Sequence, residues 1–248
     1  MANVERQRGG RHLAPLPAEF AETRDALRRL AVYVLSPARK AVTGRIGLQP
    51  TPGGFGTPVF GEGEQLRVEG ATLHRLTAGT AESAPITSLA AAADFAGVKL
   101  SDDPGVGHDI PELGDPDGPL PVSPPAALAL GAFYGFAGSV LAEFKAELDA
   151  GGHECSAVQL WPEHFDLGCN IDGVNFGSSP GDGYSAEPYV YVGPWNSEGL
   201  SGDFWNAPFG AVLSYRDLLA VGGDQRQAAL AFLRRGAGLA LSQAGEVP

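Results

Sequence analysis

The chain contains two successive sets of helix-forming and strand-forming segments in the same order. A helix-periodic segment, 17–43, is followed by short extended segments and a second helical segment, 87–97. From residue 124 the order recurs, with helical segments at 124–150 and 224–241 on either side of further extended segments. Parallel β-α-β alternation is missing from this pattern. The order therefore predicts an α+β fold with antiparallel sheets flanked by helices. Strands are expected at 45–49, 56–60, 65–69, 72–77, 156–161, 165–171, 187–193 and 210–214.

The segment 102–123 is rich in proline, glycine and aspartate, which predicts a linker. The predicted domains are an N-terminal α+β half, 1–101, and a C-terminal α+β half, 124–248, which carries the candidate site. Two similar helix-strands-helix halves fit the pattern, and so does one shared core, because no residue-level repeat decides between them. Within the first helix, Pro37 predicts a kink or a break.

The composition is acidic, with 29 Asp and Glu against 17 Lys and Arg and a net charge of −12. Nucleic acids and anionic membranes are bound through Lys and Arg patches, so neither is expected as a partner. Residues 1–11 lack a secretory apolar region, and no apolar run is expected to approach the roughly 18 residues of a membrane span. We expect a cytoplasmic protein in which Cys155 and Cys169 are reduced, buried thiols.

The 65 residues from Gly151 to Tyr215 contain no Lys or Arg, yet they contain all three tryptophans and four of the six tyrosines. Solvated surfaces normally mix both signs of charge. The segment therefore predicts a small-molecule ligand that is cationic, metallic or neutral and hydroxyl-rich, and it disfavours phosphates. Its eight carboxylates are Glu154, Glu163, Asp166, Asp172, Asp182, Glu187, Glu198 and Asp203.

The segment 161–171 has the clearest alternation of polar and apolar residues. Pro162 cannot donate to a sheet, which predicts a turn before a strand that starts near His164. A divalent metal ion bound by His164 and Asp166 is one hypothesis, and orientation of the imidazole by the carboxylate is another. The alternative is a solvent-facing turn histidine. One strand face would carry His164, Asp166, Gly168 and Asn170, and the apolar face would carry Phe165, Leu167, Cys169 and Ile171.

Further candidate ligand contacts follow along the chain. Asp172-Gly173 is typical of a type I′ hairpin, so Asp172 is expected to be a turn residue. The segment 177–183 predicts a flexible loop that offers Ser179 and Asp182 to a ligand. Beyond it, alternation places Glu187, Tyr189 and Tyr191 on one strand face. Apolar pocket walls are expected from Trp195, Trp205 and Phe209, which alternatively fill the core.

The motifs Leu160-Trp-Pro-Glu-His-Phe-Asp-Leu-Gly168, Ser179-Pro-Gly-Asp182 and Glu187-Pro-Tyr-Val-Tyr-Val-Gly-Pro-Trp195 resemble those of a group of uncharacterised actinobacterial hypothetical proteins. The likeness covers about 50 residues. The order of a helix, a Phe-Asp-Leu strand and an aromatic strand also resembles, more distantly, a bacterial domain of unknown function. These resemblances imply a fold and an actinobacterial origin, but no activity.

Three functions are consistent with these residues. The first is an enzyme that acts on a small neutral or cationic, sugar-like substrate, with Glu163, His164, Asp166 and Glu187 as catalytic residues. The second is a noncatalytic small-ligand-binding protein, and the third is a structural or protein-interaction domain. The ligand contacts expected in the first two are Asn170, Ser179, Asp182, Tyr189, Tyr191, Trp195 and Trp205.

Overall fold

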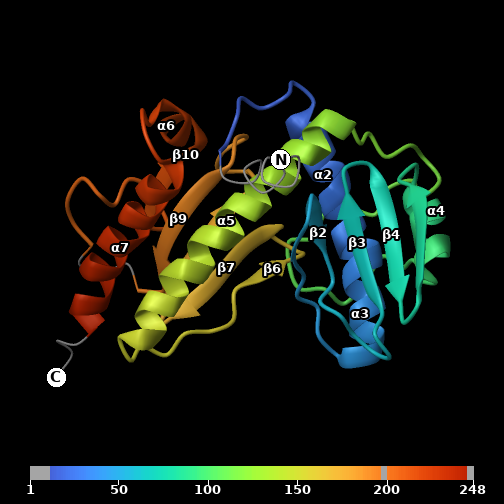
Figure 1. Ribbon diagram of the computed structural model, residues 1–248, viewed down its shortest axis with the longest axis horizontal. Helices are drawn as coiled ribbons and strands as arrows, with labels where there is room; N and C mark the ends of the chain where they lie inside the picture. Colours follow the sequence, from blue (N-terminus) through green and yellow to red (C-terminus); the bar gives the residue numbers. More distant parts are fainter. Residues whose placement is uncertain (1–11, 197–199, 245–248) are drawn as a thin grey trace, which may run out of the picture. The chain divides into compact units, whose positions relative to one another are not determined.

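The computed structural model describes residues 12–196 and 200–244, with side chains to residue 241. It confirms the α+β fold and contains two five-stranded antiparallel sheets (Figure 1). Contacts divide the described residues into two compact units. Unit 1 comprises 12–14, 136–159, 166–196 and 200–244, and unit 2 comprises 15–135 and 160–165.

The first helical segment of unit 2 changes its winding at its centre. Helix α2 (Phe20–Leu30) leads into a π-helical turn, Ala31–Leu35, and then into α3 (Ser36–Thr43). Pro37 lies just after this turn in a helix that continues from α2, and its missing N–H removes one helical hydrogen bond at the junction. The widened turn directly before Pro37 thus takes the place of the expected break. The next helix, α4 (Leu89–Ala96), is capped by Ser88, whose Oγ accepts from the Ala91 N–H at 3.1 Å.

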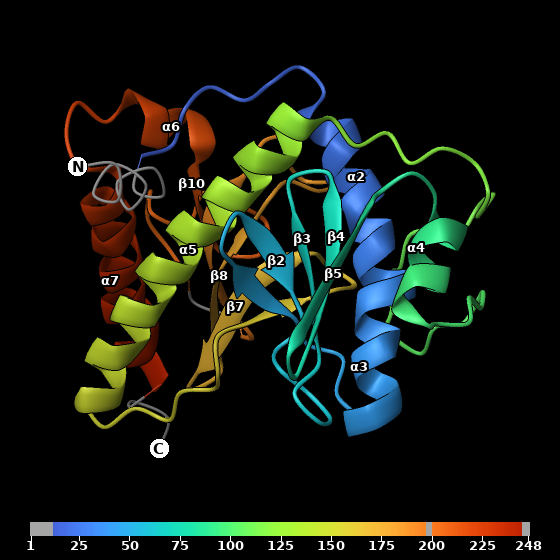
Figure 2. The same ribbon diagram turned by 45° about the vertical axis from the view of Figure 1, so that its right-hand side comes forward.

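The first sheet is an antiparallel meander with strands in the order β1-β2-β3-β4-β5 (Figure 2). Strands β3 and β4 have the expected bounds, whereas β1 and β2 lie at 49–51 and 54–56 instead of the expected 45–49 and 56–60. Strand β5 was not expected from the sequence, because almost all of its residues are exposed and no apolar alternation marks it. The bounds are Gln49–Thr51 for β1, Gly54–Gly56 for β2, Gln65–Glu69 for β3, Thr72–Thr77 for β4 and Thr80–Pro85 for β5.

The second sheet has the strand order β10-β9-β8-β7-β6. In unit 1 its apolar face packs against helices, as shown by the rings of Phe144 and Phe176, whose centroids lie 4.9 Å apart. The β7–β8 hairpin turns at Asp172 (φ 47°) and Gly173 (φ 81°), as predicted for a type I′ turn. The bounds are Gln159–Trp161 for β6, Asp166–Ile171 for β7, Val174–Ser179 for β8, Tyr189–Pro194 for β9, Ala211–Ser214 for β10, Tyr215–Ala220 for α6 and Gln225–Ala244 for α7.

Helix α5 (Pro124–Ala150) has the predicted bounds and contributes its first part to unit 2 and its second part to unit 1. The expectation that no apolar run approaches the length of a membrane span is wrong for this helix. Among the described residues, it is long and apolar enough to span a membrane by length and composition alone. However, 56% of the 18-residue apolar stretch of this helix is buried inside the protein. A core helix has this burial, which is consistent with a soluble protein, and the cytoplasmic location stays a prediction.

The segment 102–123, expected as a linker, contains no helix or strand but packs within unit 2. The Tyr33 hydroxyl donates to the carbonyl of Pro111 at 2.6 Å, and the Leu120 N–H donates to the carbonyl of Thr87 at 2.8 Å. Contacts therefore separate the units at residue 135, inside α5, rather than at this segment.

Two glycines of α5 test its packing within unit 2. A Cβ at Gly131 would meet the Gly53 carbonyl and lie 2.8 Å from the Gly54 nitrogen, whereas a Cβ at Gly135 would meet nothing within 4 Å. We expect Gly131→Ala to lower the free energy of unfolding by about 1–3 kcal/mol. The matched Gly135→Ala should raise it by about 0.5–1 kcal/mol, because alanine favours a helix interior. Urea unfolding measures both, and equal effects would contradict this packing.

Candidate functional site

The polar face of the second sheet carries a tyrosine that lies across two glycines. Gly168 of β7, Gly177 of β8 and Tyr191 of β9 are neighbours in the strand register. A Cβ at Gly177 would lie 2.5 Å from the Tyr191 hydroxyl oxygen, and one at Gly168 would lie 3.1 Å from it. Only glycine leaves room for this ring. The Tyr191 hydroxyl thereby reaches Asp166 and donates to its carboxylate.

A second aspartate, Asp182, organises the loop between β8 and β9. The hydroxyls of Tyr189 and Ser179 donate to its Oδ2 at 2.5 and 3.1 Å. The backbone N–H groups of Tyr184 and Ser185 donate to its Oδ1 at 2.8 and 3.3 Å. Four hydrogen bonds occupy this carboxylate, so its evident role is to hold the loop.

Both tyrosine pKa values are raised in this environment. Burial raises the pKa of Tyr189 above its ordinary value, and the hydrogen bond to Asp182 raises it further. Burial also holds the pKa of Tyr191 well above its ordinary value, followed by the charge of Asp166 and the hydrogen bond to it. The two phenols are therefore neutral donors at pH 7.

The rings of Tyr184, Tyr189, Tyr191 and Phe209 form one cluster on this face. Their centroids are 5.1–6.4 Å apart in edge-to-face or tilted arrangements. Rings at these distances are in contact, so they fill the space between them rather than enclosing a ligand. The structure thus brings Asp166, Ser179, Asp182, Tyr189 and Tyr191 together on a packed surface.

Three other predicted ligand residues lie elsewhere. Asn170 donates to Asn175 Oδ1 at 2.9 Å, and the Trp195 Nε1–H donates to the same oxygen at 3.2 Å. Trp195 is 73% exposed. Trp205 packs edge-on against Phe204, with ring centroids 5.0 Å apart. The two tryptophans therefore do not line a common pocket with Asp166 and Asp182.

The predicted catalytic residues are divided between the units. Glu163 and His164 belong to unit 2, and Asp166 and Glu187 belong to unit 1. Glu163 is buried, whereas His164 and Glu187 are exposed. The expected strand position of His164 is wrong, because residues 162–165 form a turn that ends at Phe165 with φ 59°, and β7 begins only at Asp166.

The prediction of a flexible loop at 177–183 also needs correction. Gly177, Ser178 and Ser179 are buried residues of β8, and Tyr191 on the neighbouring strand covers Gly177. For the predicted metal site, residues 12–196 and 200–244 contain no group of three or more His, Cys, Asp or Glu side chains that could hold a metal ion. The pair of His164 and Asp166 has no support as a metal centre from this arrangement.

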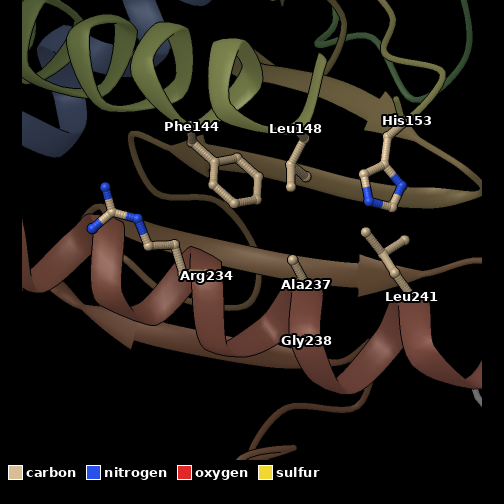
Figure 3. Close-up of a pocket in the computed structure, with 7 residues that line it drawn as sticks. All are labelled: Phe144, Leu148, His153, Arg234, Ala237, Gly238 and Leu241. Carbon is tan, nitrogen blue, oxygen red and sulfur yellow. The ribbon is translucent and has the colours of Figure 1, made fainter. Parts of the chain in front are cut away.

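A pocket with a volume of about 420 Å³ lies between the second part of α5 and helix α7, entirely within unit 1. Figure 3 shows Phe144 and Leu148 projecting from α5 toward Ala237 of α7, with His153 and Arg234 at opposite ends. Most of the wall is apolar, and the volume falls in the range of about 300–1,000 Å³ found for small-ligand sites. The lining residues are Phe144, Leu148, His153, Arg234, Ala237, Gly238 and Leu241.

His153 supplies the polar group at one end of this pocket. Its Nδ1 lies 2.6 Å from Asp172 Oδ2, and Asp172 Oδ1 accepts from the Glu154 N–H at 3.2 Å. The hydrogen bond to His153 is the largest cause that lowers the pKa of Asp172. A carboxylate on one ring nitrogen fixes the orientation of the imidazole and leaves the other nitrogen available.

Arg234 at the other end is held by acids of α5. Its Nε and Nη2 donate to the Glu147 carboxylate at 2.8 and 2.5 Å, and Nη2 lies 3.6 Å from Glu143 Oε1. The hydrogen bonds from Arg234 lower the pKa of Glu147. Each end of the pocket therefore carries its own countercharge, and the described residues of the apolar wall between them add no further charge.

Sequence reasoning missed this pocket and took Asp172 only as a turn residue. Its walls come from helices about 90 residues apart, and His153 and Asp172 are separated by 19 residues without a motif. The one available signal was the Gly151-Gly152 break that ends α5 directly before a histidine.

No protein-family model, curated protein or solved structure matches this chain. The resemblance to actinobacterial proteins therefore stays a prediction, and the site rests on its geometry.

The raised tyrosine pKa values give a prediction for alkaline pH. In the unfolded chain the phenols ionise near pH 10, whereas in the folded chain they stay neutral to higher pH. Stability is therefore complete below pH 10 and is lost as the pH rises toward the folded pKa values. We expect the free energy of unfolding to fall between pH 9 and 11, and to fall less in Tyr191→Phe. Urea unfolding at both pH values measures this.

At pH 7 we expect Tyr191→Phe to lower the free energy of unfolding by about 1.5–3 kcal/mol, because the variant lacks the hydrogen bond to the Asp166 carboxylate. The value at pH 7 is the reference for the same variant at alkaline pH. An equally steep alkaline loss of stability in the wild type and the variant would show that Tyr191 ionises as readily in the folded chain as in the unfolded one.

Proposed function

We propose that unit 1 binds a small, uncharged and largely apolar molecule in the pocket between α5 and α7. One observation carries the proposal: an apolar space of about 420 Å³ meets a single oriented imidazole, that of His153. Ligand sites in proteins combine apolar walls with a few fixed polar groups in the same way. Binding of a small neutral ligand is one of the functions that the composition of the 151–215 segment favours.

The charges around the pocket support an uncharged ligand. Asp172 faces the His153 ring at one end, and Glu147 and Glu143 face Arg234 at the other. A ligand carboxylate would compete with Glu147 for a guanidinium that is already paired. The described residues that line the pocket include no carboxylate, so an ammonium group would leave water for apolar walls without a countercharge among them.

Catalysis is a second candidate function for the same pocket. A carboxylate that holds Nδ1 of a histidine orients the ring for general base chemistry at Nε2. This supports an enzyme that uses His153 and Asp172 rather than the set Glu163, His164, Asp166 and Glu187. A catalytic role for the latter set, with or without a divalent metal ion, stays a prediction.

The pocket can be filled without disturbing the helix that forms it. Gly238 lines the pocket, and a Cβ added there would meet no atom within 4 Å. We expect Gly238→Leu to weaken binding of 4-propylphenol by about tenfold or more, which corresponds to about 1.4 kcal/mol. Isothermal titration calorimetry of the full chain measures the dissociation constant.

The matched control is Ala231→Leu, which places the same side chain at an exposed position of α7 outside the pocket. It should bind 4-propylphenol as the wild type does. The proposal fails if the wild type binds neither 4-propylphenol nor propylbenzene, or if both leucine variants bind as tightly as the wild type.

A further inference from the structure

The hydrogen bonds around Asp172 determine which nitrogen of His153 carries the proton. An ionised carboxylate only accepts hydrogen bonds, so Nδ1 must donate to Asp172 Oδ2 across 2.6 Å. The neutral imidazole then has a bare Nε2, which is an acceptor. Lowering of the Asp172 pKa by His153 favours the ionised carboxylate that this arrangement requires.

The bare nitrogen is directed toward the pocket. Figure 3 shows the His153 ring above Leu241, with one ring nitrogen toward the side where Leu148 and Ala237 lie and the other turned away. Because Nδ1 is engaged by Asp172, the nitrogen on the pocket side is Nε2. Apart from Arg234, which is paired with Glu147, the remaining lining residues are apolar or glycine.

We propose that the ligand of this pocket is an apolar alcohol or phenol whose hydroxyl donates a hydrogen bond to Nε2 of His153. The inference rests on the proposed function and names the ligand class for the same site. A hydroxyl satisfies the acceptor, whereas an ether or ketone of the same shape presents only lone pairs to it. Sites that hydrogen-bond a substrate hydroxyl discriminate strongly against analogues that lack it.

Asp172→Asn should reverse this preference. The Glu154 N–H holds Oδ1 of residue 172, so the amide oxygen of an asparagine takes that position and its NH₂ group faces His153 Nδ1. Nδ1 must then accept, which moves the ring proton to Nε2 and turns Nε2 into a donor. Asparagine also tolerates the positive φ of 47° at this position, so the turn is retained.

The test compares two probes of nearly equal shape, 4-propylphenol and 4-propylanisole, by calorimetric titration of the full chain at pH 8.5. We expect the wild type to bind the phenol about tenfold more tightly than the ether. We expect Asp172→Asn to bind the ether at least as tightly as the phenol. In His153→Phe, which removes both ring nitrogens, the two probes should bind equally.

The outcomes separate the inference from the proposed function. If the wild type binds both probes equally, or if Asp172→Asn keeps the wild-type preference, the hydroxyl inference is wrong and the apolar pocket stands. If the wild type binds neither probe nor propylbenzene, both proposals are overturned. Circular dichroism of each variant identifies any change of fold.

Discussion

Burial of helix α5 shapes the core of both units. Its 27 residues are predominantly apolar and must be removed from water along much of the helix. The first part does so in unit 2, where Gly131 allows close approach to Gly53, and the second part does so in unit 1, where Phe144 meets Phe176. The same second part supplies Phe144 and Leu148 to the pocket wall. A helix needed for folding therefore also forms the candidate binding site.

Three carboxylates of the acidic segment 151–215 accept hydrogen bonds from side chains other than Lys and Arg and from backbone N–H groups. Asp166 accepts from Tyr191, and Asp182 accepts from hydroxyls and backbone N–H groups. Asp172 accepts from His153 and from a backbone N–H. Hydrogen bonds of this kind stabilise a carboxylate without a Lys or Arg. The structure thus explains how three of the acids are stabilised without Lys or Arg. The lack of basic residues in this segment therefore does not by itself require a cationic ligand.

Local periodicity predicted much of the fold, because it reports which residues of one element are buried. The bounds of α5, the alternation in β7 and β9 and the Asp172-Gly173 turn could all be read in this way. Exposed β5 has no such signal. Local periodicity also does not predict contacts between distant residues. The pocket brings Leu148 and Ala237 together, and only the register of three strands shows why Gly168 and Gly177 face Tyr191.

The position of the proton on the His153 ring shows whether an oriented acceptor faces the apolar pocket. Long-range ¹H–¹⁵N NMR of the imidazole distinguishes a protonated from a bare ring nitrogen. We expect a protonated Nδ1 and a bare Nε2 at pH 8.5, with the Nε2 resonance alone moving strongly when 4-propylphenol is added. A proton on Nε2, or an imidazole spectrum that does not respond to the phenol, would show that Nε2 of His153 is not the acceptor for the ligand hydroxyl.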